Sequence, residues 1–237
     1  PSDISGLVAW WDPSDSSTIT LSGSGVTADV TAIANKVNGG KSLVTYGNSP
    51  HIATASLNRK DVLSFVADDG LHTNGVLTDA NAVTMFFVYD AQNDTQAVMF
   101  NSGNNQFVST FQENSSNNMI DHESGTPQYH VDGAFVGITG GYQNTTITRG
   151  GWHELISDGT GWHIIGGVGS NFSAWASGDF IVFNYNTWET SGLLADLIVY
   201  SSNLSTSDRQ KVEGYLAHKW DLTAKLPSNH PYKIYGP

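Results

Sequence analysis

The chain has no cysteine among its 237 residues. Disulfide bonds and thiolate metal sites are therefore excluded, and cysteine usage says nothing about the redox compartment. No apolar stretch approaches the length that crosses a membrane, so we expect no membrane insertion. No signal-peptide pattern opens the chain. Residue 1 is a proline, so we expect either a whole protein that has lost its initiator methionine or a domain cut from a longer one.

Basic residues are scarce. Only 10 Lys and Arg stand against 22 Asp and Glu, and the formal net charge is -12. Nucleic-acid binding requires clustered Lys and Arg, so the composition argues against a nucleic-acid partner. The same scarcity disfavours binding to an anionic membrane surface.

The abundant residues favour a turn-rich β protein. Glycine occurs 25 times, aromatic residues make up 11% of the chain, and a hydrophobic fraction of 39% suffices for a substantial core. Short apolar runs recur between Gly, Asn and Ser clusters, a rhythm typical of a sandwich or barrel. The run Val83–Tyr89 is the most apolar and predicts a central strand. Neither a repeat nor a linker divides the chain, so we expect one domain over residues 1–237.

The C-terminal part contains the clearest switch from strand to helix. Residues Leu193–Tyr200 are almost all apolar, which predicts a strand covered on both faces. Ser205 is a good N-cap, and Asp208 lies three residues on, as in a capping box. We therefore expect a helix over about residues 205–220. Its apolar residues recur at helical spacing and end in Trp220, which we expect to lie in the core.

Three segments carry a resemblance to a known family: GLVAWWDPSD at the start, DVLSFVADDGL near residue 61, and LLADLIVYSSNLSTSDRQKVEGYLAHKWDL followed by LPSNHPY. They resemble the laminin-G-like, concanavalin A-like domains of bacterial surface proteins and bacteriophage structural proteins. The resemblance implies an all-β fold, a concanavalin A-like jelly-roll sandwich of two antiparallel sheets with one C-terminal α-helix. It also implies that the first strand pairs with Leu193–Tyr200. The helix is then expected at the edge or rim of the sandwich, where it would cover an exposed sheet edge.

Enzymes of this fold need particular residue patterns. A retaining hydrolase of the laminarinase type places two carboxyl groups about 5 Å apart, which Glu-x-Asp-x-x-Glu on one strand supplies. The chain contains no such run, and the lyase pattern of a basic residue, Gln-x-His and a tyrosine is also missing. We therefore expect no enzyme. The alternative is a polysaccharide-active hydrolase or lyase with an unusual site, in which Glu154, Asp158 or Glu189 faces a cleft.

Histidines and loop oxygens supply the metal candidates. His153 and His163 can face each other across a hairpin, although ordinary polar partners on a strand pair explain them more simply. Calcium requires about six to eight oxygen ligands. We expect that the protein requires no cofactor. If a metal ion binds, the oxygen-rich loops favour calcium. The candidate calcium ligands are Asp90, Asn93 and Asp94.

Sugar recognition uses aromatic rings against the apolar faces of pyranoses, framed by Asn, Asp and backbone groups. Residues 170–190 fit this chemistry, because their aromatic side chains lie among Gly and Ser residues where exposure is expected. The opposing explanation is that these aromatic residues cap the ends of the sandwich, and the sequence leaves both open. The predicted glycan ligands are Asn171, Trp175, Tyr185, Asn186 and Trp188.

The sequence thus predicts a noncatalytic binding or structural module of an extracellular assembly. Our first expectation is a virion surface protein, such as a capsid decoration, fibre or tail attachment protein, that also binds a glycan. The alternative is a glycan-binding domain of a bacterial surface protein. The expected partners are a glycan, other virion or surface proteins, or further copies of the chain, in a homo-oligomer. The expected location is the virion surface or the extracellular space.

Overall fold

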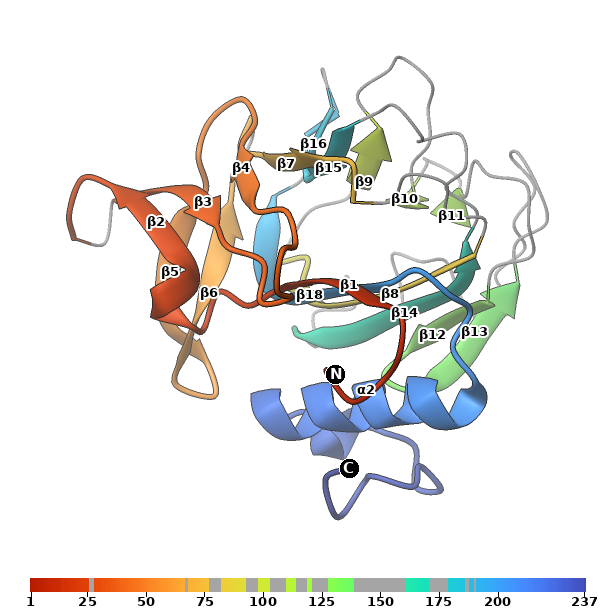
Figure 1. The fold of residues 1–237 in the computed structure, drawn as a ribbon. Coiled ribbons are helices and arrows are strands. Elements are labelled where there is room, and N and C mark those ends of the chain that lie inside the picture. Colours follow the sequence, from red (N-terminus) through yellow and green to blue (C-terminus); the bar gives the residue numbers. More distant parts are fainter. Residues whose placement is uncertain are drawn as a thin grey trace.

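The structure, a computed structural model, describes residues 1–25, 28–66, 68–76, 82–92, 98–102, 110–113, 119–120, 128–138, 161–170, 179–185, 188–189 and 191–237. Within them, antiparallel strands and one α-helix near the C-terminus, α2 (Thr206–Trp220), form a β-sandwich (Figure 1). The all-β class expected from the sequence is confirmed. Two 3-10 helices span Ser16–Thr18 and Thr223–Lys225. The strands are β1 (Leu7–Trp11), β2 (Ile19–Ser22), β3 (Asp29–Ile33), β4 (Leu43–Thr45), β5 (His51–Leu57), β6 (Lys60–Phe65), β7 (Leu71–Asn74), β8 (Val83–Asp90), β9 (Val98–Ser102), β10 (Thr110–Glu113), β11 (Met119–Ile120), β12 (Gln128–Val131), β13 (Ala134–Ile138), β14 (His163–Ser170), β15 (Asp179–Val182), β16 (Asn184–Tyr185), β17 (Trp188–Glu189) and β18 (Gly192–Tyr200).

Two layers face each other, and one continuous sheet forms both. Its strand order is β11-β10-β9-β15-β7-β4-β3-β5-β6-β18-β8-β14-β12-β13, and it turns over through β3, β5 and β6 (Figure 1). We call β18, β8, β14, β12 and β13, together with β1, the helix layer. We call β4, β7, β15, β9, β10 and β11 the far layer. The two sheets expected from the sequence are therefore joined along one side.

Strand β18 lies inside the helix layer and joins the two ends of the chain. Along one edge it pairs with β8. Along the other edge, its residues 192–194 pair with β6 and its residues 197–200 pair with β1. Every residue of β18 is buried, as its apolar pattern predicts. The expected pairing of the first strand with Leu193–Tyr200 is thus confirmed.

The helix covers the outer face of the helix layer. On β8, Met85 and Phe87 face the core between the two layers. Phe86 and Val88 face the other way and pack with Trp220 of α2, which lies beneath the sheet (Figure 1). A strand that is apolar on both faces requires a cover on each face. The expectation that the helix would cover a sheet edge or rim is therefore wrong.

The ends of α2 are fixed by local hydrogen bonds. Ser205 Oγ accepts a hydrogen bond from the Asp208 N–H and donates one to the Asp208 carboxylate, which confirms Ser205 as the N-cap. Asp221 ends the helix in the left-handed conformation, with φ of 59°. No helix among the described residues is both long enough and apolar enough to cross a membrane.

The C-terminal segment packs tightly against α2 at Gly214. A Cβ built there would lie 2.9 Å from Cγ of Tyr232, which is closer than real Cβ contacts. Although alanine favours a helix by about 1 kcal/mol over glycine, we expect Gly214→Ala to displace Tyr232 from the helix. Limited proteolysis should then cut residues 227–237 faster, while circular dichroism shows the helix retained. Ser207→Ala, at an exposed position of α2, is the control and should change neither. Unchanged proteolysis in the Gly214 variant would contradict the close packing.

Candidate functional site

The far layer presents a row of residues on its outer face. Leu71 is fully buried in the core between the layers, so its neighbour His72 lies on the opposite face of β7. The register continues this row across the sheet, because Val44 of β4 and Ile181 of β15 both pair with His72, and Asn101 of β9 pairs with Ile181. Val44 is 42% exposed, which shows that solvent reaches the outer face at β4.

Two polar residues pair further along the same two strands. Asn74 and Asp179 are cross-strand partners, each two residues along its strand from the first row. The ring of Tyr46 lies 5.2 Å from the half-buried imidazole of His72. The register thus brings the chain positions of Asn74 and Asp179 near the imidazole of His72 and the phenol ring of Tyr46. Polar groups beside an aromatic ring are the chemistry that binds sugars.

A short ribbon continues directly from this layer. After β15, the chain forms the antiparallel pair β16 and β17, and β16 lies against β9 (Figure 1). The register places Tyr185 opposite Trp188 and Asn184 opposite Glu189. Two of the predicted glycan ligands, Tyr185 and Trp188, are therefore brought together. Glu189, a carboxylate named from the sequence, is next to them.

Other predicted residues lie outside the described residues. This holds for the glycan candidates Asn171, Trp175 and Asn186, and their roles stay predictions. It holds equally for Glu154 and Asp158.

The calcium prediction rests on one described residue. Asp90 Oδ1 accepts a hydrogen bond of 2.9 Å from the Gln92 N–H, as in an ordinary turn. Asn93 and Asp94 are outside the described residues. Among the described residues, no group of three or more His, Asp or Glu side chains is placed to hold a metal ion. Calcium at Asp90, Asn93 and Asp94 stays a prediction.

His163 has a different partner from the one considered in the sequence. Its Nδ1 lies 2.7 Å from a carboxylate oxygen of Asp132, whose other oxygen accepts the N–H of Ile164. The His163 ring is only 5% exposed. Because Asp132 lies in the turn between β12 and β13, the pair holds this turn against β14. His153 is outside the described residues. The pair is therefore structural.

A buried carboxylate lies under α2, and sequence reasoning missed it. Asp196 of β18 is 0% exposed. One of its oxygens accepts a hydrogen bond of 2.9 Å from Trp10 Nε1. The other oxygen accepts hydrogen bonds from Trp220 Nε1 at 2.9 Å and from Lys219 Nζ at 2.6 Å. Burial raises the pKa of Asp196, and the nearby Lys219 ammonium partly opposes this. Because no surface of Asp196 is open, a substrate does not reach it.

The same ammonium connects Asp196 to the surface. Lys219 Nζ lies 2.7 Å from Asp12, and Lys36 Nζ lies 3.1 Å from Asp12 and 2.9 Å from Asp15. Burial by itself would raise the pKa of Asp12, but the Lys219 charge and hydrogen bonds outweigh it, so this pKa is lowered. This alternating series of charges ties β1 to α2 and to the loop that carries Lys36. These ion pairs stabilise the fold. The candidate functional site is therefore the far layer.

Comparisons with known proteins bear on the class of the chain. No family model matches it, and no curated protein matches it. One similar solved structure is a mutant GH54 α-L-arabinofuranosidase soaked with 4-nitrophenyl α-L-arabinofuranoside, at 15% identity and a TM-score of 0.47, covering 93% of this chain and 60% of that chain. Another is an arabinofuranosidase complexed with arabinofuranosyl-α-1,2-xylobiose, at 14% identity and a TM-score of 0.44, covering 92% of this chain and 60% of that chain. The chain thus spans less than two thirds of these enzymes, and the likeness concerns the fold alone.

These neighbours correct two predictions. The sequence predicted a noncatalytic module, first of all on a virion surface, and no enzyme. The similar solved structures are glycoside hydrolases, and a virion role has no support among them. Both predictions are therefore wrong on this finding. Membership of the laminin-G-like domains stays a prediction, because no family model matches.

Proposed function

We propose that this chain is a polysaccharide-active domain whose site lies on the outer face of the far layer, between Asp179 on β15 and the ribbon β16–β17. The observation that carries the proposal is the register described above. It brings His72, Asp179 and the Tyr185–Trp188 pair, residues distant in the sequence, to one sheet and the ribbon that continues it. This is the alternative that the sequence left open; Glu189 is kept from the residues named there, and Asp179 and His72 are added.

The residue types suit the cleavage of a glycosidic bond. Hydrolysis requires two carboxyl groups, one acting as an acid and the other as a base or nucleophile. In the proposal, Asp179 supplies one of these groups and His72 binds the substrate beside it, while Glu189, opposite Asn184 and five strand positions away, binds the sugar chain at the ribbon. The aromatic pair of the ribbon provides the apolar surface on which a sugar ring stacks.

The test measures turnover by the intact chain. Arabinoxylan, arabinan, alginate and 4-nitrophenyl α-L-arabinofuranoside are the probes, with new reducing ends, unsaturated products and released nitrophenol as readouts. We expect Asp179→Asn to lower kcat by about 10²–10⁴-fold, the usual contribution of an acid or base, and Glu189→Gln to weaken substrate binding and raise KM. Asp221→Asn is the matched control, since asparagine also suits the left-handed φ of 59° at that exposed position.

Two results would contradict the proposal. One is wild-type protein that turns over none of the probes. The other is turnover that both carboxylate variants retain in full, because the cleavage would then take place at other residues.

A further inference from the structure

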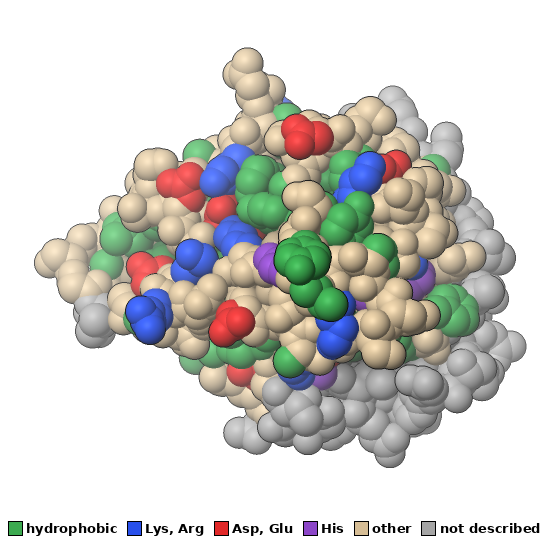
Figure 2. Space-filling view, turned by 90° about the horizontal axis from the view of Figure 1, so that it is seen from below, with side chains coloured by type: hydrophobic (Ala, Val, Ile, Leu, Met, Phe, Trp, Pro, Cys, Tyr) green, Lys and Arg blue, Asp and Glu red, His purple; other side chains and the backbone are tan. Residues whose placement is uncertain are grey.

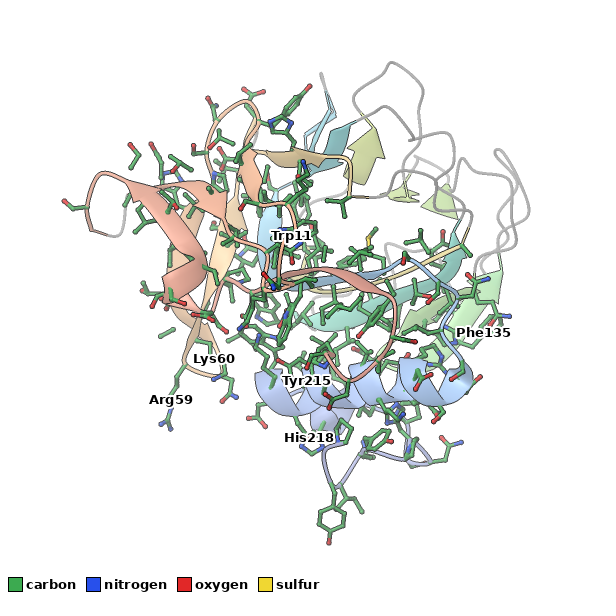
Figure 3. All side chains as sticks on the ribbon, in the orientation of Figure 1. Trp11, Arg59, Lys60, Phe135, Tyr215 and His218 are labelled. Carbon is green, nitrogen blue, oxygen red and sulfur yellow. The ribbon has the colours of Figure 1, made fainter. Side chains whose placement is uncertain are left out.

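A cleft of about 550 Å³ opens on the opposite side of the molecule from the far layer. It lies where the N-terminal segment, β1, α2 and the C-terminal segment meet, and its volume is in the range of small-molecule sites. Figure 2 views this side, where hydrophobic patches alternate with acidic and basic side chains. Figure 3 shows Tyr215 on the side of α2 toward the helix layer and His218 on the opposite side.

A second cleft of about 400 Å³ adjoins the first. Both are lined by Ser2, Ile4 and Trp10, and the second also reaches Lys36 and Asn38. The two clefts therefore form one groove, with Trp10 between its halves. We call it the Trp10 groove. A groove that continues on both sides of an aromatic ring suits an elongated ligand better than a compact one.

Trp10 is held in one orientation by contacts from several elements. Its Nε1 donates to the buried Asp196 carboxylate at 2.9 Å. Its ring meets the edge of Tyr215 at 5.8 Å between centroids, and Lys36 Nζ lies 4.6 Å from the ring centre. The side chain is nevertheless only partly buried. An aromatic surface that is fixed before a ligand arrives loses little conformational entropy on binding.

The groove has the lining of a sugar site and carries charged groups of both signs. Aromatic rings come from three different elements, as Trp10, Tyr215 and Tyr232. Asp3 supplies a carboxylate, and Lys211 supplies an ammonium that is already paired with Asp208 at 2.9 Å. The ammonium of Lys36 is likewise paired, with Asp12 at 3.1 Å and Asp15 at 2.9 Å. A ligand with a strong charge would meet groups of both signs. Hydroxyl groups, in contrast, hydrogen-bond to either.

We propose that the Trp10 groove binds an uncharged linear oligosaccharide. This site is separate from the far layer, so it holds a chain without cleaving it, and its existence does not depend on the proposed catalytic residues. In a polysaccharide-active protein, such a site keeps the polymer near the enzyme after each cleavage and raises its effective concentration.

The experiment uses nuclear magnetic resonance of the full chain labelled with nitrogen-15. Xylohexaose, cellohexaose and maltohexaose are added separately, and the indole N–H signal of Trp10 is followed after assignment with Trp10→Phe. We expect at least one of them to shift this signal with saturation. Tyr232→Ala should weaken that binding about tenfold, which corresponds to about 1.4 kcal/mol. Tyr235→Ala is the matched control, because Tyr235 is 80% exposed on the same segment and does not line the groove.

Asp3→Asn tests the site without touching an aromatic contact and should also weaken binding. The proposal is overturned if none of the three hexasaccharides shifts the Trp10 signal. It is also overturned if Tyr232→Ala and Tyr235→Ala bind alike. Asp179→Asn separates this site from the catalytic one. That variant should keep the Trp10 shift in full, whether or not the wild type has turnover, and its loss would place the binding on the far layer.

Discussion

Lys219→Met is expected to lower the free energy of unfolding by about 3–5 kcal/mol at neutral pH, the cost of removing one partner from a buried ion pair. Lys219 is 11% exposed, and its ammonium lies within hydrogen-bond distance of Asp196 and Asp12. Methionine fills much of the same space, so the loss measures charge more than packing. Asp196 keeps its two indole donors, which do not neutralise its charge.

The destabilisation should shrink as the pH falls. Burial already raises the pKa of Asp196, and without the Lys219 charge we expect it to rise further. The folded protein then binds a proton at a higher pH than the unfolded chain. Stability lost at neutral pH is therefore regained as the pH falls through the folded-state pKa. Chemical denaturation at neutral pH and near pH 5 measures the difference.

Lys211→Met is the control for this variant. Lys211 lies on the same helix and has an ion pair of its own, but it is exposed to solvent. Its replacement should leave the denaturation midpoint unchanged at both pH values. If the two methionine variants behaved alike, the buried charges would contribute nothing specific to stability.

The sequence predicted the strands and the helix start whose signals lie within a few neighbouring residues. Val83–Tyr89 and Leu193–Tyr200 are long apolar runs, and each forms a strand that is buried on both faces. Ser205 was found because an N-cap acts on residues only three positions away. Strand β5 was missed, because in His51–Leu57 small and polar residues hide the alternation. The face covered by α2 was missed as well, since a stripe on a helix does not say which surface it meets.

The candidate site depends on contacts that no local pattern contains. Tyr185 and Trp188 were named because they are aromatic residues among Gly and Ser residues, and their pairing across the ribbon appears only in the structure. His72 and Asp179 come together only through the pairing of β7 with β15, strands that are far apart in the sequence. Asp196 looks like an interruption of an apolar run until Trp10, 186 residues away, is seen to donate to it. A single polar residue in such a run is a signal to look for buried donors elsewhere.

Trp220→Ala is expected to cost about 3–5 kcal/mol, as large aromatic truncations in cores do. Trp220 is fully buried between α2 and the helix layer, and its Nε1 donates to Asp196 at 2.9 Å. Two losses are therefore combined in this variant, a cavity and a missing hydrogen bond to a charged group. Trp220→Phe separates them, because it refills most of the space without restoring the donor.

We expect Trp220→Phe to cost about 1–3 kcal/mol, the range for a hydrogen bond lost by a buried charged group. Denaturant unfolding of the wild type and both variants gives the two costs, and turnover per folded molecule should stay unchanged because the far layer is on the other side of the sandwich (Figure 1). Equal costs for Phe and Ala would assign the stability of this junction to the Asp196 bond and not to packing. A smaller loss of unfolding free energy in Trp220→Phe than in Trp220→Ala means that packing of the aromatic ring stabilises the junction of β1, β18 and α2.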